Sequence, residues 1–212
     1  MTDDSGARGS GTDDRTREPD STTDRWLSDV PVLETQLPSD LQTALGRLLG
    51  AEPVETLEEW IAAVRRRTGG GPIAVDDLCH AGEETAHWGE LDGTRYRFRC
   101  FYDAVLLSAL AERPVAIRTE SPDGTVIEAR AAGTTGLTTT PETAVFSFGV
   151  DDSVEPPSNG EPSHADVYAA VCPYVRAFPD REAYERWADS VSAATVAMPL
   201  EGATELAAAL TD

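Results

Sequence analysis

The segment CFYDAVLLSAL, residues 100–110, most constrains the fold, because its pattern predicts a helix that is apolar on nearly all sides. Phe101, Ala104, Val105 and Leu107 are spread around the helix axis rather than along one stripe. Other elements must cover most of the surface of such a helix. The chain has 212 residues, which is long enough to build a core around it.

Before this segment, the pattern predicts two amphipathic helices, a short third helix and a β-hairpin. The helices are expected between Pro38 and Gly50, between Thr56 and the glycines at 69–71, and around 75–80. Asp92-Gly93 predicts a two-residue hairpin turn between strands at 86–91 and 94–98. This order predicts a small winged-helix-like module. We interpret Arg65–Arg67 as the basic end of a helix rather than a nucleic-acid patch.

After the apolar helix, the pattern predicts several short strands, a long strand and two closing helices. The short strands are expected at 115–119, 125–131, 144–150 and 195–198, and the long strand at 167–178. The fold class is therefore predicted to be α+β, with a mixed or antiparallel β-sheet core and flanking helices. We predict a disordered acidic tail at 1–24, the winged-helix-like module at 25–98, and an α+β domain with the candidate catalytic residues at 99–212.

The formal net charge is −21, and all 17 basic residues are arginine. This balance excludes the classes of protein that need a basic face, so we expect neither nucleic-acid binding nor docking on anionic membranes. The complete lack of lysine favours adaptation to high salt, where carboxylates keep the surface hydrated and salt screens their repulsion. Residues 1–24 carry no apolar leader, so we expect a cytoplasmic protein.

The cysteines Cys79, Cys100 and Cys172 form neither a CxxC pair nor a zinc-binding spacing. A lone cysteine of this kind is commonly a small buried apolar residue. Cys100 differs, because Asp103 follows one helical turn later and its carboxylate can reach the same face. A thiol beside a carboxyl group is suited to proton transfer, and burying an acid in so apolar a helix requires a reason.

Cys172 lies on the predicted strand 167–178. If this strand packs near the Cys100 helix, two thiols and one carboxylate share an apolar pocket. Two soft sulfur ligands suit a soft, linearly coordinated metal such as mercury or copper(I). The three histidines, His80, His87 and His164, do not cluster with the cysteines in the sequence, and we assign them no role.

These residues resemble the organomercurial (alkylmercury) lyase family. The resemblance is carried by Cys100-x-x-Asp103 after residues 95–98, by the strand-like segment 171–178 around Cys172, and by the segment from Pro179 to Trp187. It extends from about residue 38 to the C-terminus. Together with the composition, it identifies the chain as similar to a salt-adapted, haloarchaeal-type member of that family.

The resemblance implies protonolytic cleavage of a carbon–mercury bond. Cys100 and Cys172 would bind mercury as thiolates, and Asp103 would relay the proton to the leaving carbon. The substrate would be an organomercurial small molecule, and low-molecular-weight thiols or a mercuric reductase would accept the Hg(II) product. No organic cofactor is expected, because the substrate brings the metal. Pro173, Tyr174 and Arg176 depart from the family pattern near the second cysteine.

Two other functions remain open at this point. A non-enzymatic carrier of Hg(II) or Cu(I) on the same fold would use Cys100 and Cys172 without needing Asp103. A thiol redox protein is the weaker alternative, because redox pairs are usually CxxC. Cys79 is either a buried structural residue or an accessory thiol that passes mercury.

Overall fold

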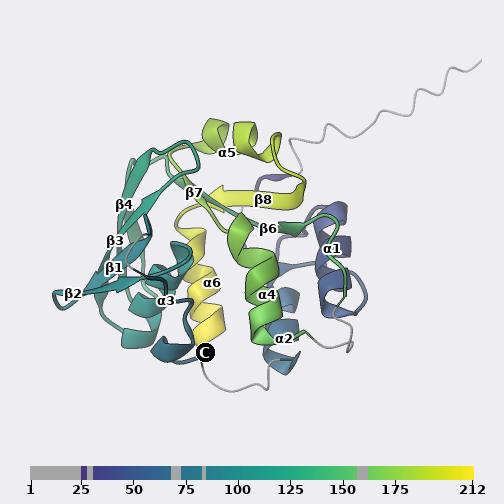
Figure 1. Cartoon of the computed structure of the whole chain (residues 1–212), viewed down its shortest axis with the longest axis horizontal. Helices are drawn as coiled ribbons and strands as arrows, with labels where there is room; N and C mark the ends of the chain where they lie inside the picture. The colour runs from purple at the N-terminus through teal and green to yellow at the C-terminus, as the bar shows by residue number, and fades with distance from the viewer. Residues whose placement is uncertain (1–24, 28–30, 68–72, 83–84, 157–161) are drawn as a thin grey trace, which may run out of the picture.

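The computed structural model describes residues 25–27, 31–67, 73–82, 85–156 and 162–212. The tail predicted at 1–24 and the glycines at 69–71 lie outside these residues. Within the described part, two antiparallel sheets pack against helices, and α4 and α6 lie below the smaller sheet in the view of Figure 1. This arrangement confirms the predicted α+β class with an antiparallel sheet core.

The larger sheet has the strand order β2-β1-β3-β4-β5, with antiparallel neighbours throughout. Its strands are β1 (Trp88–Leu91), β2 (Thr94–Arg97), β3 (Pro114–Glu120), β4 (Val126–Ala132) and β5 (Leu137–Thr140). The predicted hairpin is confirmed, since Leu91 pairs with Thr94 and the turn residues Asp92 and Gly93 have φ of 53° and 78°. Strand β5 was not predicted.

The smaller sheet has the order β7-β6-β8. Its central strand β6 (Val145–Asp151) is buried along almost its whole length, between β7 (Ala177–Phe178) and β8 (Ala193–Pro199). The buried Ser147 keeps its polar atoms paired, because its hydroxyl donates to the Tyr174 carbonyl at 2.7 Å. The sheet thereby holds the chain segment that follows Cys172.

The first two helices predicted in the N-terminal half are confirmed. Helix α1 (Ser39–Leu49) ends at Gly50, whose φ is 58°, and α2 (Leu57–Arg67) begins where the Thr56 hydroxyl accepts the Glu59 N–H at 3.2 Å. The third predicted helix is shorter than expected and consists of a 3₁₀ turn, Val75–Asp77. The remaining helices are α3 (Tyr102–Ala111), α4 (His164–Val171), α5 (Arg181–Ala188) and α6 (Gly202–Thr211).

Helix α3 is buried from Tyr102 to Ala109, as its apolar pattern predicts. It packs against α6 and against the larger sheet. Gly89 on β1 permits this approach, because a Cβ atom there would lie 3.1 Å from the Cβ of Ala104 and 2.9 Å from Val115. The helix begins two residues later than predicted, so Cys100 lies just before its first turn.

The strand predicted at 167–178 is wrong. Residues His164–Val171 form α4, Cys172–Tyr174 form a 3₁₀ turn, and only Ala177–Phe178 are a strand. A capping box at Ser163 and Asp166 starts the helix. Val167 and Val171 then face the core at helical spacing, and both are buried. Pro173 follows directly and prevents the helix from continuing.

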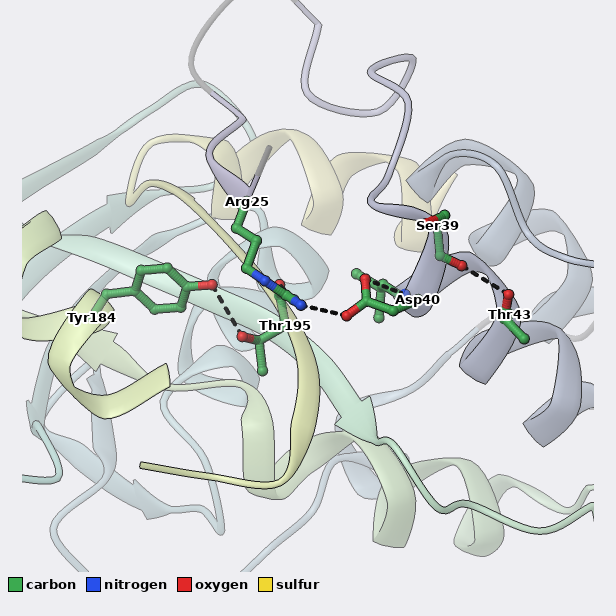
Figure 2. Close-up of polar contacts among 7 residues, drawn as sticks. Arg25, Ser39, Asp40, Thr43, Tyr184 and Thr195 are labelled. Atoms are coloured by element: carbon green, nitrogen blue, oxygen red, sulfur yellow. Dashed lines mark hydrogen bonds and ion pairs between the residues drawn. The ribbon is translucent and has the colours of Figure 1, made fainter. Parts of the chain in front are cut away.

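Contacts join the N-terminal segment to the smaller sheet. Figure 2 shows Arg25 between Asp40 of α1 and Thr195 of β8, with its guanidinium donating to the Thr195 carbonyl at 2.8 Å.

One hydrophobic core includes Leu41 of α1 and Val105 of α3. The hairpin of the predicted module pairs with β3, so it lies in the larger sheet. The winged-helix-like arrangement and the domain bounds stay predictions. No helix within the described residues is long and apolar enough to cross a membrane.

Candidate functional site

A small cavity lies among α2, α3, α4, α6 and β6. Its volume is about 100 Å³, and its lining is mainly apolar, including Trp60, Phe148, Val167 and Leu206. The polar exceptions include Cys100, Asp103 and Cys172. The structure therefore brings together the three residues that the sequence singled out, although it places Cys172 at a helix end rather than on a strand.

Cys100 and Asp103 are in direct contact. The Cys100 Sγ donates a hydrogen bond to Asp103 Oδ2 at 3.5 Å, and the two residues are 4% and 3% exposed. Burial raises the pKa of the Asp103 carboxyl group to about 6, while the hydrogen bonds from the Cys100 thiol and the Cys79 backbone N–H oppose the rise. The carboxyl group is thus a proton donor suited to nearly neutral pH.

Tyr102 also lines this cavity, next to Asp103. Its ring is stacked on Phe146 at an interplanar angle of 12°, and its hydroxyl has no hydrogen-bond partner among the described residues. Burial, reinforced by the Asp103 and Cys100 charges, raises the pKa of the Tyr102 phenol. Tyr102 therefore stays neutral beside Cys100 and Asp103.

Cys172 follows α4 directly, and its thiol is half-buried. The thiols of Cys100 and Cys79 both interact with it, and these contacts together with burial raise the pKa of the Cys172 thiol. Each of these neighbours is a free cysteine. Because thiolates at this spacing would repel one another, the contacts favour the neutral thiol at Cys172.

Cys79 belongs to a second hollow, which the sequence did not predict. This outer depression has a volume of about 800 Å³ and is lined by Asp76, His80, Arg99 and both Cys79 and Cys172, among others. Cys79 reaches it because the Cys79 carbonyl accepts the Arg99 N–H at 2.9 Å. No spacing in the sequence indicates that Cys79 lies next to Arg99. Their contact depends on the isolated β-bridge between His80 and Phe98, next to the hairpin.

The MerB family model, alkylmercury lyase, matches residues 81–212, which is more than half of the chain. The chain belongs to the alkylmercury lyase family. The matched segment contains Cys100, Asp103 and Cys172, and Cys79 lies just before it.

One solved structure similar to this alkylmercury lyase family member is the mercury-bound form of MerB2, at 21% sequence identity and a TM-score of 0.46. The similarity covers 60% of this chain and 58% of that one, so the chain spans less than two thirds of that protein's length. No curated protein sequence matches the chain.

His80 shares the outer depression with Cys79 and Cys172, whereas His87 lines neither hollow. His87 is buried, and its Nδ1 lies 2.6 Å from the Thr119 hydroxyl. His80 lies at the outer depression, where its Nε2 is 2.9 Å from the Val75 carbonyl, and the side chain of His164 lies outside the described residues. Within the described ranges, no three His, Cys, Asp or Glu side chains are grouped as a ready-made metal site.

Proposed function

We propose that this chain is an organomercurial lyase that cleaves a carbon–mercury bond by protonolysis. The observation that carries the proposal is the hydrogen bond between the Cys100 thiol and the Asp103 carboxyl group, in an apolar cavity that Cys172 also lines. Membership of the alkylmercury lyase family supports it. The products would be a hydrocarbon and Hg(II) held by Cys100 and Cys172.

The two thiols supply the affinity for the metal. Mercury is a soft ion that prefers thiolate ligands, and two sulfur atoms satisfy its linear coordination. Donation from both sulfurs weakens the bond between mercury and carbon. The apolar wall formed by Trp60, Phe148 and Val167 would hold the organic group away from water.

The cavity size favours small organic groups. An apolar cavity of about 150 Å³ is enough to hold benzene, whereas this one has about 100 Å³. We therefore propose short alkyl groups, such as methyl, as the substituents that fit without movement of the walls.

Asp103 supplies the proton to carbon. As Cys100 binds mercury, its S–H proton passes to the Asp103 carboxylate at the contact already present. The neutral carboxyl group then protonates the carbon, the mercury–carbon bond breaks, and the hydrocarbon leaves. Over the whole reaction, two thiols lose their protons, one proton ends on the hydrocarbon, one is released to solvent, and mercury stays Hg(II).

This chemistry indicates which cofactors and partners the reaction would need. No organic cofactor is required, because the substrate brings the metal. Low-molecular-weight thiols or a mercuric reductase would take the Hg(II) from the two cysteines. We also propose a cytoplasmic location and a high-salt, haloarchaeal-type setting, on the basis of the net charge of −21 and the absence of lysine.

The proposal is tested by incubating the reduced protein with methylmercury in concentrated KCl and measuring methane in the headspace. We expect methane from the wild type and at least about a hundredfold slower release from Asp103→Asn, since general acid catalysis contributes that much or more. Cys100→Ser and Cys172→Ser should release none. Asp123→Asn is the matched control, because Asp123 is an exposed turn residue that lines neither hollow.

Two outcomes would contradict the proposal. Tight binding of methylmercury without methane would assign the chain to the carriers. Undiminished methane release from Asp103→Asn would show that another acid protonates the carbon.

A further inference from the structure

The three thiols lie in series between the inner cavity and the outer depression. Cys100 lines only the inner cavity, Cys79 lines only the outer depression, and Cys172 lines both. The Cys172 thiol interacts with each of the other two. A metal ion bound between Cys100 and Cys172 would therefore have a further thiol beside it, on the side that faces outward.

Backbone contacts hold Cys79 in this position. Its carbonyl accepts the Arg99 N–H at 2.9 Å, and the Ala81 N–H donates to the Arg97 carbonyl at 2.9 Å. Its own backbone N–H donates to the Asp103 carboxylate. The preceding residue, Leu78, is buried at 4% exposure. The segment that carries Cys79 is thus attached to the chain immediately before Cys100.

We propose that Cys79 and Cys172 form a second two-sulfur site for Hg(II), which receives the metal from the Cys100–Cys172 pair and presents it at the outer depression. The inference rests on the lyase function proposed above and adds the exit route of its product. Nothing in the cleavage step uses Cys79, so the two sites have separate tasks.

The transfer is a ligand exchange at mercury. The bond from mercury to the Cys79 sulfur forms, the bond to the Cys100 sulfur breaks, and the Cys172 sulfur stays bound throughout. The proton that Cys79 loses ends on the Cys100 sulfur, which is thereby ready for the next substrate. Mercury remains Hg(II), so the step needs no oxidant or reductant.

The sizes of the two hollows explain why an outer site is useful. An acceptor thiol with its own substituents does not fit a cavity of about 100 Å³, whereas the outer depression has about 800 Å³. Within the described residues, no three ligands are grouped to hold a metal together. Two-coordinate transfer fits this arrangement better than permanent storage on three sulfurs.

The first test exploits the fact that the chain has only 3 cysteines. Hg(II) chloride is added to reduced Cys100→Ser, and the sulfur ligands are counted by X-ray absorption spectroscopy at the mercury edge. We expect two sulfur ligands in Cys100→Ser and a single protein sulfur in Cys100→Ser/Cys79→Ser. A single protein sulfur in Cys100→Ser would overturn the inference. Circular dichroism of each metal-free variant verifies folding.

The second test measures the exit rate. Wild type and Cys79→Ser are loaded with Hg(II) chloride, and loss of the mercury–sulfur absorbance is followed after adding excess glutathione. We expect transfer at least about tenfold slower from Cys79→Ser, because thiol exchange then depends on direct entry into the inner cavity. Equal rates would overturn the inference. Cys79→Ala serves as a second variant in case serine perturbs the fold.

These tests do not depend on carbon–mercury cleavage, because they begin with inorganic Hg(II). A protein that releases no methane yet shows the expected sulfur counts would disprove the lyase function and leave the second site standing. The reverse result would disprove the second site alone.

Discussion

The Cys100 Sγ lies 3.5 Å from Asp103 Oδ2, and both residues are almost wholly buried. The contact places an acid and a thiol where they can exchange a proton without water. Burial of the acid lowers the stability of the fold, because it raises the pKa of Asp103 from 3.8 to about 6. The site residue that would protonate carbon is therefore predicted to destabilise the fold.

Asp103→Asn is expected to stabilise the protein at neutral pH. The folded-state pKa of Asp103 is raised. Its favourable contribution to the free energy of unfolding is therefore complete below pH 3.8 and is lost as the pH rises through about 6. At about pH 7 the charged carboxylate costs up to about 3 kcal/mol, which asparagine removes while still accepting hydrogen bonds. Urea unfolding of both proteins as a function of pH measures this difference.

The pH dependence supplies the control for that experiment. The stability difference between Asp103→Asn and wild type should shrink as the pH falls below about 6 and vanish below 3.8, where the wild-type carboxyl group is neutral in both the folded and the unfolded state. A difference that is independent of pH would mean that the asparagine acts through packing, and it would contradict the raised pKa.

His87 is expected to reduce stability in mildly acidic solution. Burial lowers the pKa of His87 below 6.5, the nearby Arg176 lowers it further, and Glu120 opposes this. Because the folded-state pKa is depressed, the stabilising contribution is present above pH 6.5 and is lost as the pH falls from there through the folded-state pKa. The free energy of unfolding of wild type should therefore fall more steeply than that of His87→Gln over this window. Parallel curves would refute the prediction.

Two tyrosines offer a matched test of buried hydroxyl groups. The Tyr184 hydroxyl lies 3.0 Å from the Thr195 hydroxyl, whereas the Tyr102 hydroxyl has no partner among the described residues. Tyr184→Phe should lose about 1 kcal/mol of stability, and Tyr102→Phe should leave stability unchanged or raise it by about that amount. Thermal unfolding of the two variants measures this. An equal loss in both would indicate a hydrogen bond to Tyr102.

Salt is expected to stabilise the whole fold. With a net charge of −21, the carboxylates of the chain repel one another at low ionic strength. The screening length falls from about 10 Å at 0.1 M to about 3 Å at 1 M salt, which weakens this repulsion. The midpoint of thermal unfolding should rise steadily over this range and beyond. A chain equally stable at low and at molar KCl would contradict salt adaptation.

The sequence predicts the parts of the fold that depend on local patterns. The apolar helix α3, the Asp92-Gly93 hairpin and the end of α1 at Gly50 follow from burial and turn chemistry within a few residues. The juxtaposition of Cys100 and Asp103 follows from their separation by three residues at the start of α3. These signals are local, so a single sequence carries them.

The errors occur where local signals compete or where distant segments meet. In the segment 167–178 the weak alternation of apolar residues suggested a strand, but the capping box at Ser163 and the spacing of Val167 and Val171 favour a helix. The approach of Cys79 to Cys172 depends on the pairing of residues 79–81 with 97–99, which has no signature in the sequence.

The most direct measurement of the central claim is cleavage of methylmercury in deuterated water under single-turnover conditions. If Asp103 delivers an exchangeable proton to carbon, the methane formed carries one deuterium, and its amount equals the mercury retained by the protein. Retention of mercury without methane, or methane without deuterium, would contradict protonolysis at this site.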